Sequence, residues 1–96
     1  MEVIIQSIDF TAGEELEGYV REKMQKLDKL DDKIIRARVK LEKGQGSTNN
    51  HLCDVRLEVP GNDHIVKKTG NSYQEALLVA IDTLQDVVKR SKEKQS

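Results

Sequence analysis

Residues 35 to 42 constrain the fold most strongly, because apolar and charged side chains alternate there without a break. The segment reads Ile-Arg-Ala-Arg-Val-Lys-Leu-Glu, with every odd-numbered position apolar. Successive side chains of a β-strand point to opposite faces, so this strand has one apolar face and one charged face. The sheet that contains it must therefore bury one face and leave the other in water.

Three further segments have the composition or the alternation of β-strands. Val3–Ile8 is short and β-branched, with apolar residues on both faces, as expected for a strand covered on at least one side. Alternation resumes over Cys53–Val59. Pro60 and Gly61 then take the two central positions of a type II turn, which predicts one more strand over His64–Thr69. The sequence thus predicts four strands, three of them consecutive.

Two segments have the spacing of amphipathic helices, and each follows a capping-box pattern. Apolar residues recur at intervals of three and four over Glu14–Leu30, after Thr11-Ala-Gly-Glu14, and Asp31-Asp32 ends that helix. A second helix follows Ser72-Tyr-Gln-Glu75 and runs to about Lys92. In both boxes the hydroxyl oxygen is expected to accept the N–H of the glutamate three residues later.

The predicted class is α+β, with the order β-α-β-β-β-α and two helices packed on one face of a four-stranded sheet. A chain of 96 residues holds one such core, so residues 1–96 are expected to form a single domain, with an ordered core of about 2–92 and a tail of 93–96. Arg36, Arg38 and Lys40 are expected on the open face of the sheet. The helices are expected to bury Leu16, Val20, Leu27, Ala80, Leu84 and Val87.

The bulk composition favours a cytoplasmic protein. No apolar run approaches the roughly 20 residues that span a bilayer, and the N-terminal sequence lacks the basic head and cleavage site of a signal peptide. The single cysteine, Cys53, cannot form an internal disulfide, which suits a reducing compartment.

The chain offers no recognisable catalytic, metal or phosphate-loop motif. His51-x-Cys53 supplies two potential ligands with no CxxC or second histidine nearby, which falls short of a zinc site. Gly44-x-Gly46-Ser lacks the lysine and the length of a phosphate loop, so it is interpreted as a flexible turn in a hairpin. No serine, cysteine or carboxylate sits in a catalytic constellation. We therefore expect a protein that is not an enzyme and that needs neither a metal nor another cofactor.

Basic residues are segregated, although the net charge is −1. On a helical wheel Lys23 lies within the apolar stripe of the first helix, and Lys26 and Lys33 lie on its flank beside Tyr19. A lysine so placed lays its methylene stem along the core and sends its ammonium out at the edge, here toward the second helix. The second helix ends in Lys-Arg-Ser-Lys-Glu-Lys over residues 89–94.

Such clusters are open to two interpretations. Cations at suitable spacing bind RNA phosphates without a sequence code. Lysines at a helix C-terminus also interact favourably with the helix dipole in any protein. In contrast, the strand cations Arg36, Arg38 and Lys40 face Asp54 and Glu58 on the next strand, which favours neutralising cross-strand pairs over a binding surface. Phe10, Tyr19 and Tyr73 are too few to form a platform that stacks several bases.

The spacing over Thr11–Leu41 resembles the ribosome hibernation promoting factor family, also known as ribosome-associated inhibitor or protein Y. The resemblance rests on Thr11-x-x-Glu-x-Leu-x-x-Tyr-Val-x-x-Lys-Met-x-Lys-Leu-Asp28 and on Ile34-Ile-x-Ala-x-Val-x-Leu41. The second half agrees through Gly70, through Ser72-Tyr-x-Glu-Ala-Leu77, and through Ala80-Ile-Asp82 before a basic helix end. The resemblance covers nearly the whole chain.

This resemblance implies a fold like that of double-stranded-RNA-binding domains. It further implies a factor that lodges in the messenger and transfer RNA channel of the small ribosomal subunit and stops translation under stress or in stationary phase. The partner would be ribosomal RNA backbone, and the protein would be monomeric off the ribosome. The positions that match the family's RNA-contacting side chains are Lys23 and Lys26, with Lys29 and Lys33 added, and Lys89, Arg90 and Lys92.

Two departures from the family pattern carry expectations of their own. The middle of the second helix holds Leu78, Thr83, Gln85 and Asp86, where the family commonly has an acidic residue and then basic ones, which implies weaker or shifted contacts. The chain also resembles the short form of the family, without the domain by which long forms pair ribosomes, so dimer formation would need a second factor.

The competing hypothesis is a protein-interaction module of the same fold that binds no RNA. Leu78 and Val79 lie off the main apolar stripe of the second helix, and an exposed apolar pair is typical of a contact surface.

Overall fold

The computed structural model describes residues 1–46 and 50–94, with side chains as far as Lys92. The elements follow the predicted order: β1 (Glu2–Ser7), α1 (Glu14–Leu30), β2 (Arg36–Lys43), β3 (His51–Glu58), β4 (His64–Gly70) and α2 (Tyr73–Lys94). The predicted α+β class and element order are confirmed. α2 continues to Lys94, two residues beyond its expected end, and the remaining tail residues 95–96 lie outside the described residues.

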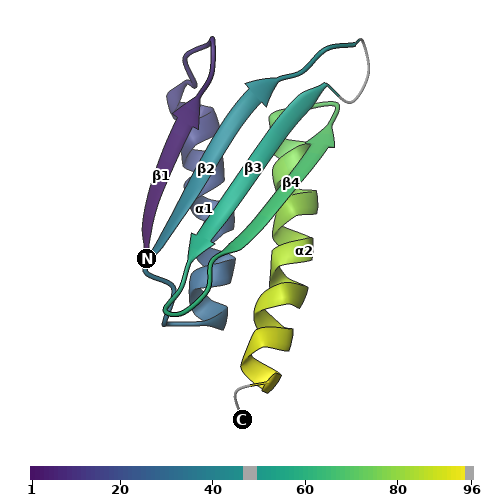
Figure 1. Cartoon of the computed structure of the whole chain (residues 1–96). Coiled ribbons are helices and arrows are strands. Elements are labelled where there is room, and N and C mark those ends of the chain that lie inside the picture. The colour runs from purple at the N-terminus through teal and green to yellow at the C-terminus, as the bar shows by residue number, and fades with distance from the viewer. Residues whose placement is uncertain (47–49, 95–96) are drawn as a thin grey trace.

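The four strands form one sheet in the order β1-β2-β3-β4 (Figure 1). β1 pairs parallel to β2 through the crossover helix α1, whereas β2, β3 and β4 form an antiparallel meander. Gly61 has φ 93°, the left-handed conformation that the predicted type II turn requires. The β2–β3 hairpin is confirmed, but residues 47–49 of its predicted flexible turn lie outside the described residues.

The register aligns the apolar side chains on the helix-facing side of the sheet. Ile5, Val39, Val55 and Val66 lie opposite one another across the four strands. α1 and α2 lie side by side behind this face, and they run in the same direction (Figure 1). The buried core contains these residues: Val20, Met24, Leu27, Ile34, Ala37, Val39, Leu41, Cys53, Val55, Leu57, Ala76, Leu77, Ala80, Ile81, Leu84 and Val88.

Two residues expected in the core are only partly buried. Leu16 lies in the first turn of α1 and packs against the margin of the core. Val87 faces a pocket between α2 and the β3–β4 hairpin, so solvent reaches its side chain. The predictions for Val20 and Leu84 are confirmed, because both are fully buried.

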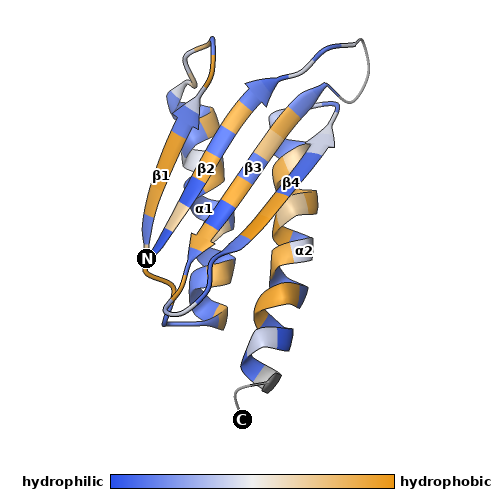
Figure 2. Cartoon of the chain, in the orientation of Figure 1, coloured by the Kyte–Doolittle hydropathy of each residue, from blue (hydrophilic) through white to orange (hydrophobic). Residues whose placement is uncertain are grey.

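The opposite face of the sheet is open to water and charged, as the alternation in β2 predicts (Figure 2). The side chain of Arg38 is 52% exposed, and its Nε lies 3.1 Å from Glu58 Oε2. Arg36 Nη1 lies 3.3 Å from the same carboxylate oxygen. The predicted neutralisation by Glu58 is therefore confirmed for both arginines.

The two predicted capping boxes have different outcomes. Ser72 Oγ accepts the backbone N–H of Glu75 over 3.1 Å, as expected for an N-cap. The Thr11 box is wrong, because Gly13 is the N-cap of α1 and no side chain caps that helix. α1 begins at Glu14, with a first backbone bond from Glu17 to Gly13, so Thr11 lies two residues before the cap.

Because Ser72 caps a helix and Thr11 does not, removing the two hydroxyl groups should destabilise the protein to different extents. Ser72→Ala should lower the free energy of unfolding by about 1 kcal/mol, because an N–H in the first turn of α2 loses its acceptor. Thr11→Ala is the matched control and should change stability by much less. Urea unfolding of both variants checks this, and equal losses would contradict the assignment of the caps.

Candidate nucleic-acid interface

The parallel course of α1 and α2 brings their C-terminal ends to the same end of the molecule (Figure 1). The Lys92 ammonium of α2 donates a hydrogen bond to the carbonyl oxygen of Leu30, the last residue of α1, over 2.7 Å. Carbonyl groups at a helix C-terminus lack intrahelical donors and carry partial negative charge, so lysines are favourable there. We call the four lysines at these helix ends the basic end: Lys29, Lys33, Lys89 and Lys92.

Lys26 and Lys23 continue the basic end along α1, about one and two turns back from Lys29. Lys26 is exposed, whereas Lys23 is partly buried. The Lys23 ammonium lies 5.4 Å from the centroid of the Tyr19 ring, which attracts the cation through its negative face. The partial burial agrees with the predicted place of Lys23 within the apolar stripe, and the direction of its ammonium toward α2 stays a prediction.

Lys33 reaches the basic end by a different route from the one predicted. The helical wheel assigned it to the flank of the first helix, but α1 ends at Leu30 with Asp31 as its C-cap. Lys33 therefore lies in the connection to β2, where its backbone N–H donates to Asp31 Oδ1 over 3.0 Å. Its side chain is exposed, three residues beyond the end of α1.

Arg90 is the predicted site residue that the structure does not bring to the basic end. Arg90 and Lys92 project about 160° apart around α2, because successive residues turn by about 100°. Since Lys92 contacts α1, Arg90 projects toward the other side of α2, where it lines a pocket with His64 of β4.

Two of the acidic residues near the basic end are already engaged. Asp28 Oδ1 lies 3.5 Å from the N-terminal ammonium group, and Asp31 accepts the N–H of Lys33. Asp32 is exposed and offsets part of the positive charge. The basic end with Lys23 and Lys26 nevertheless contributes six lysines from α1, the segment after it and the end of α2, in a chain whose net charge is −1.

The open face of the sheet is a weaker candidate for RNA binding. In addition to the two arginines bound by Glu58, Arg56 is held by Asp63, with Nη2 2.6 Å from Oδ2. Lys40 and Lys67 lie opposite Asp54 from its two neighbouring strands. Positive charge on this face therefore alternates with negative charge.

Most of the rings in the chain are already in contact with other groups. Phe10 stacks on Tyr73, with ring centroids 4.9 Å apart and an interplanar angle of 6°. His51 meets Tyr73 edge-on at 4.7 Å. Tyr19 lies under the ammonium of Lys23. Each of these four rings therefore already has a ring or cation neighbour within the protein.

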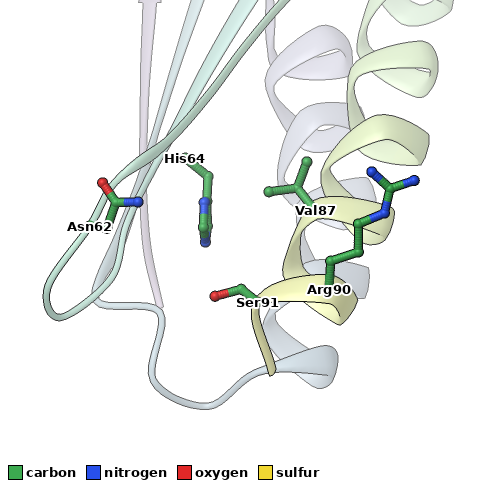
Figure 3. Close-up of a pocket in the computed structure, with 5 residues that line it drawn as sticks. All are labelled: Asn62, His64, Val87, Arg90 and Ser91. Atoms are coloured by element: carbon green, nitrogen blue, oxygen red, sulfur yellow. The ribbon is translucent and has the colours of Figure 1, made fainter. Parts of the chain in front are cut away.

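Sequence reasoning missed the pocket beside Arg90, which has a volume of about 340 Å³ (Figure 3). It is lined by Asn62, His64, Val87, Arg90 and Ser91. The hairpin residues and the helix residues are more than 20 positions apart in the sequence, and no motif links them. Only the packing of α2 against β4 brings them together.

The described residues show no arrangement typical of a metal centre. In residues 1–46 and 50–94, no group of three or more His, Cys, Asp or Glu side chains could hold a metal ion. Cys53 is buried, and this burial, with a smaller effect of the Asp54 charge, raises the pKa of its thiol to about 12. The thiol is therefore protonated at neutral pH and is a poor ligand and nucleophile. Within the same residues, neither helix combines the length and the apolar character needed to cross a membrane.

Solved structures of other proteins have folds similar to that of this chain. The fold is similar to that of the Thermus thermophilus protein Y N-terminal domain, with a TM-score of 0.80 and 22% identity over 94% of this chain and 98% of that chain. It is also similar to a ribosomal subunit interface protein from Coxiella burnetii, with a TM-score of 0.85 and 11% identity over 97% of this chain and 99% of that chain. No curated protein matches the sequence.

The sequence itself matches one protein family over residues 3–96. The family resemblance based on the spacing over Thr11–Leu41 is confirmed by this match and by the similarity to protein Y. The chain therefore belongs to the family described as sigma 54 modulation protein / S30EA ribosomal protein.

Proposed function

We propose that this protein is a ribosome hibernation factor that binds the small ribosomal subunit in its decoding channel and thereby stops translation. It acts in the cytoplasm under stress or in stationary phase, as a monomeric binding protein and not as an enzyme. The observation that supports this most directly is the convergence of two basic helix ends, joined by the hydrogen bond between Lys92 and Leu30. The chain belongs to a family whose description names a ribosomal protein, which supports the ribosome as the partner.

In the proposed mechanism, the protein stops translation by occupying the decoding channel. The lysines of the basic end, with Lys23 and Lys26, contact the phosphates of ribosomal RNA, while the folded domain fills space that messenger and transfer RNA would use. Each phosphate contact releases condensed counterions, so such binding is electrostatic and tolerant of RNA sequence. The contacts of Lys23 with Tyr19 and of Lys92 with Leu30 restrict these two side chains before binding, which lowers the entropic cost of ordering them on the RNA.

The test is a salt titration of binding to isolated small subunits. For the wild type, log affinity should fall linearly with log salt, by about 0.7 to 0.9 per phosphate neutralised. Lys23→Gln/Lys26→Gln should weaken binding and flatten the slope by roughly 1.4 to 1.8, which corresponds to two lost phosphate contacts. Circular dichroism establishes that each variant is folded.

The matched control is Arg38→Gln/Lys40→Gln, which removes two cations from the open face of the sheet. It should leave the slope nearly unchanged, because that face is balanced by carboxylates. An unchanged slope in Lys23→Gln/Lys26→Gln would remove α1 from the RNA interface. Failure of the wild type to sediment with small subunits, from growing or from starved cells, would overturn the proposed function.

A second candidate function is a protein-interaction module, which the exposure of an apolar pair on α2 favours. The side chains of Leu78 and Val79 are 40% and 42% exposed, as the sequence predicts. Binding through such a pair depends little on salt. Salt-independent association that is lost in Leu78→Ser/Val79→Ser and retained in Lys23→Gln/Lys26→Gln would favour this alternative.

A further inference from the structure

The pocket between the β3–β4 hairpin and α2 has a definite structural origin. His64 lies opposite Leu57, a buried residue, so its side chain is on the helix-facing side of the sheet. Because β4 is an edge strand, no further strand covers His64. Figure 3 shows His64, Ser91 and Val87 pointing into the space between the hairpin and α2, with Asn62 on the hairpin near His64. The Arg90 side chain extends along α2, with its guanidinium directed away from His64.

The chemistry of the pocket wall is mixed. Val87 and the His64 ring provide flat or apolar surface, while Asn62 and Ser91 provide both hydrogen-bond donors and acceptors. Arg90 adds a fixed positive charge, and none of the lining residues is acidic. The nearby carboxylate of Asp63 is held by Arg56, with contacts of 2.6 and 2.9 Å. The volume of about 340 Å³ lies at the lower end of the range of small-ligand pockets, and the wall is more polar than is usual for them.

The His64 ring differs from the other rings of the chain. Phe10, Tyr73 and His51 contact one another, and Tyr19 contacts Lys23. The His64 ring lines the open pocket. Among the described residues it is the ring for which no ring or cation neighbour is found. A nucleobase stacks on a planar side chain of this kind, and its edge binds amide and hydroxyl groups.

We propose that this pocket binds one unstacked nucleotide of a single-stranded RNA. The base lies against His64 and Val87, and Asn62 and Ser91 bind its edge. The exposed side chain of Arg90 turns toward the pocket and binds the attached phosphate. This inference deepens the proposed function, because it extends the RNA contact from the basic end around α2 to the hairpin. It also gives Arg90 a role distinct from that of Lys92, although both belong to the same basic stretch of sequence.

NMR titration of the whole protein tests the pocket without a ribosome. The probes are nucleoside monophosphates, a short single-stranded RNA of mixed sequence, and inorganic phosphate. The nucleotides and the RNA should shift the imidazole signals of His64 and leave those of His51 in place, since His51 packs against Tyr73 at a different site. Inorganic phosphate should leave the His64 signals nearly unchanged. No shift with any probe, or an equal shift with phosphate alone, would overturn the assignment of a nucleotide site.

Variants of His64 and Arg90 separate the contribution of base stacking to RNA binding from that of the positive charge. His64→Ala should weaken binding of the RNA about tenfold, within the range measured for loss of a stacked base. His64→Phe should retain most of the affinity because it keeps a flat ring. Arg90→Gln should weaken the RNA and the nucleotides together. Equal affinity in His64→Ala and in the wild type would also overturn the inference.

Small-subunit binding distinguishes the two proposals. His64→Ala should lower small-subunit affinity with an unchanged salt slope, because the proposed contact of His64 is with a base and not with a phosphate. Small-subunit binding by the wild type with no nucleotide signal at His64 would overturn the pocket alone. Nucleotide signals at His64 with no small-subunit binding would overturn the hibernation function and leave the pocket standing.

Discussion

Gly70→Ala is expected to destabilise the protein by about 1 to 3 kcal/mol, the cost typical of overpacking. Gly70 is buried at the end of β4, just before α2. A Cβ atom added there would lie 2.9 Å from the backbone nitrogen of Ala76 and 3.1 Å from Glu75 Cγ. Because the closer atom belongs to the backbone of the first turn of α2, relief requires the helix to move. The measurement is urea or thermal unfolding of the variant against the wild type.

The control is the same substitution at Gly18, in the middle of α1. A Cβ atom there would meet nothing within 4 Å, and Gly18 is exposed within a helix. Gly18→Ala should therefore stabilise the protein by roughly 0.5 to 1 kcal/mol, since alanine favours helix more than glycine does. Gly70→Ala at wild-type stability would show that the first turn of α2 lies farther from Gly70 than these distances.

Alkaline pH is expected to destabilise the protein through Cys53. Burial raises the pKa of its thiol to about 12 in the folded state, from an ordinary value of 9.0. Between these values the unfolded chain has lost the thiol proton and the folded chain retains it, so stability falls as pH rises. The loss approaches about 1.4 kcal/mol per pH unit over this window. Below pH 9 this contribution to stability is fully present.

Cys53→Ala isolates the effect of the thiol, because the other titrating groups are common to both proteins. The variant should be less stable at pH 8, since a buried side chain is shortened, but its stability should fall less steeply above pH 9. Urea unfolding at several values between pH 8 and 11 gives both curves. Parallel curves would show that the thiol ionises as readily in the folded protein as in the unfolded chain.

Much of the fold follows from local patterns in the sequence. The alternation in β2 predicted both the buried and the charged face of the sheet, and Asp31 ends α1 where expected. The first capping box failed because Thr11-x-x-Glu14 has the right residue types, while the backbone enters the helix only at Gly13. A capping box is only a preference, and the extended backbone of Gly13 places the start of the helix two residues after Thr11.

The candidate site could be predicted only in part, because its geometry depends on topology. The cations were visible on each helix separately, but the contact between Lys92 and Leu30 requires both helices to run in the same direction. That direction follows from the parallel pairing of β1 with β2 and from the return through the meander to β4. The helical turn separates Arg90 from Lys92. The packing of α2 against β4 then forms the pocket with His64, which no local pattern in the sequence predicts.

The sheet topology also has consequences for how the chain folds and opens. β2, β3 and β4 pair with their neighbours in sequence, so they can associate after closing short loops. β1 must instead find β2 across the whole of α1, with Glu2 opposite Arg36. Such a non-local parallel pairing carries a larger loop-closure entropy and forms slowly. β1 is also an edge strand, so its amide protons should exchange with solvent through a local opening that leaves the meander intact.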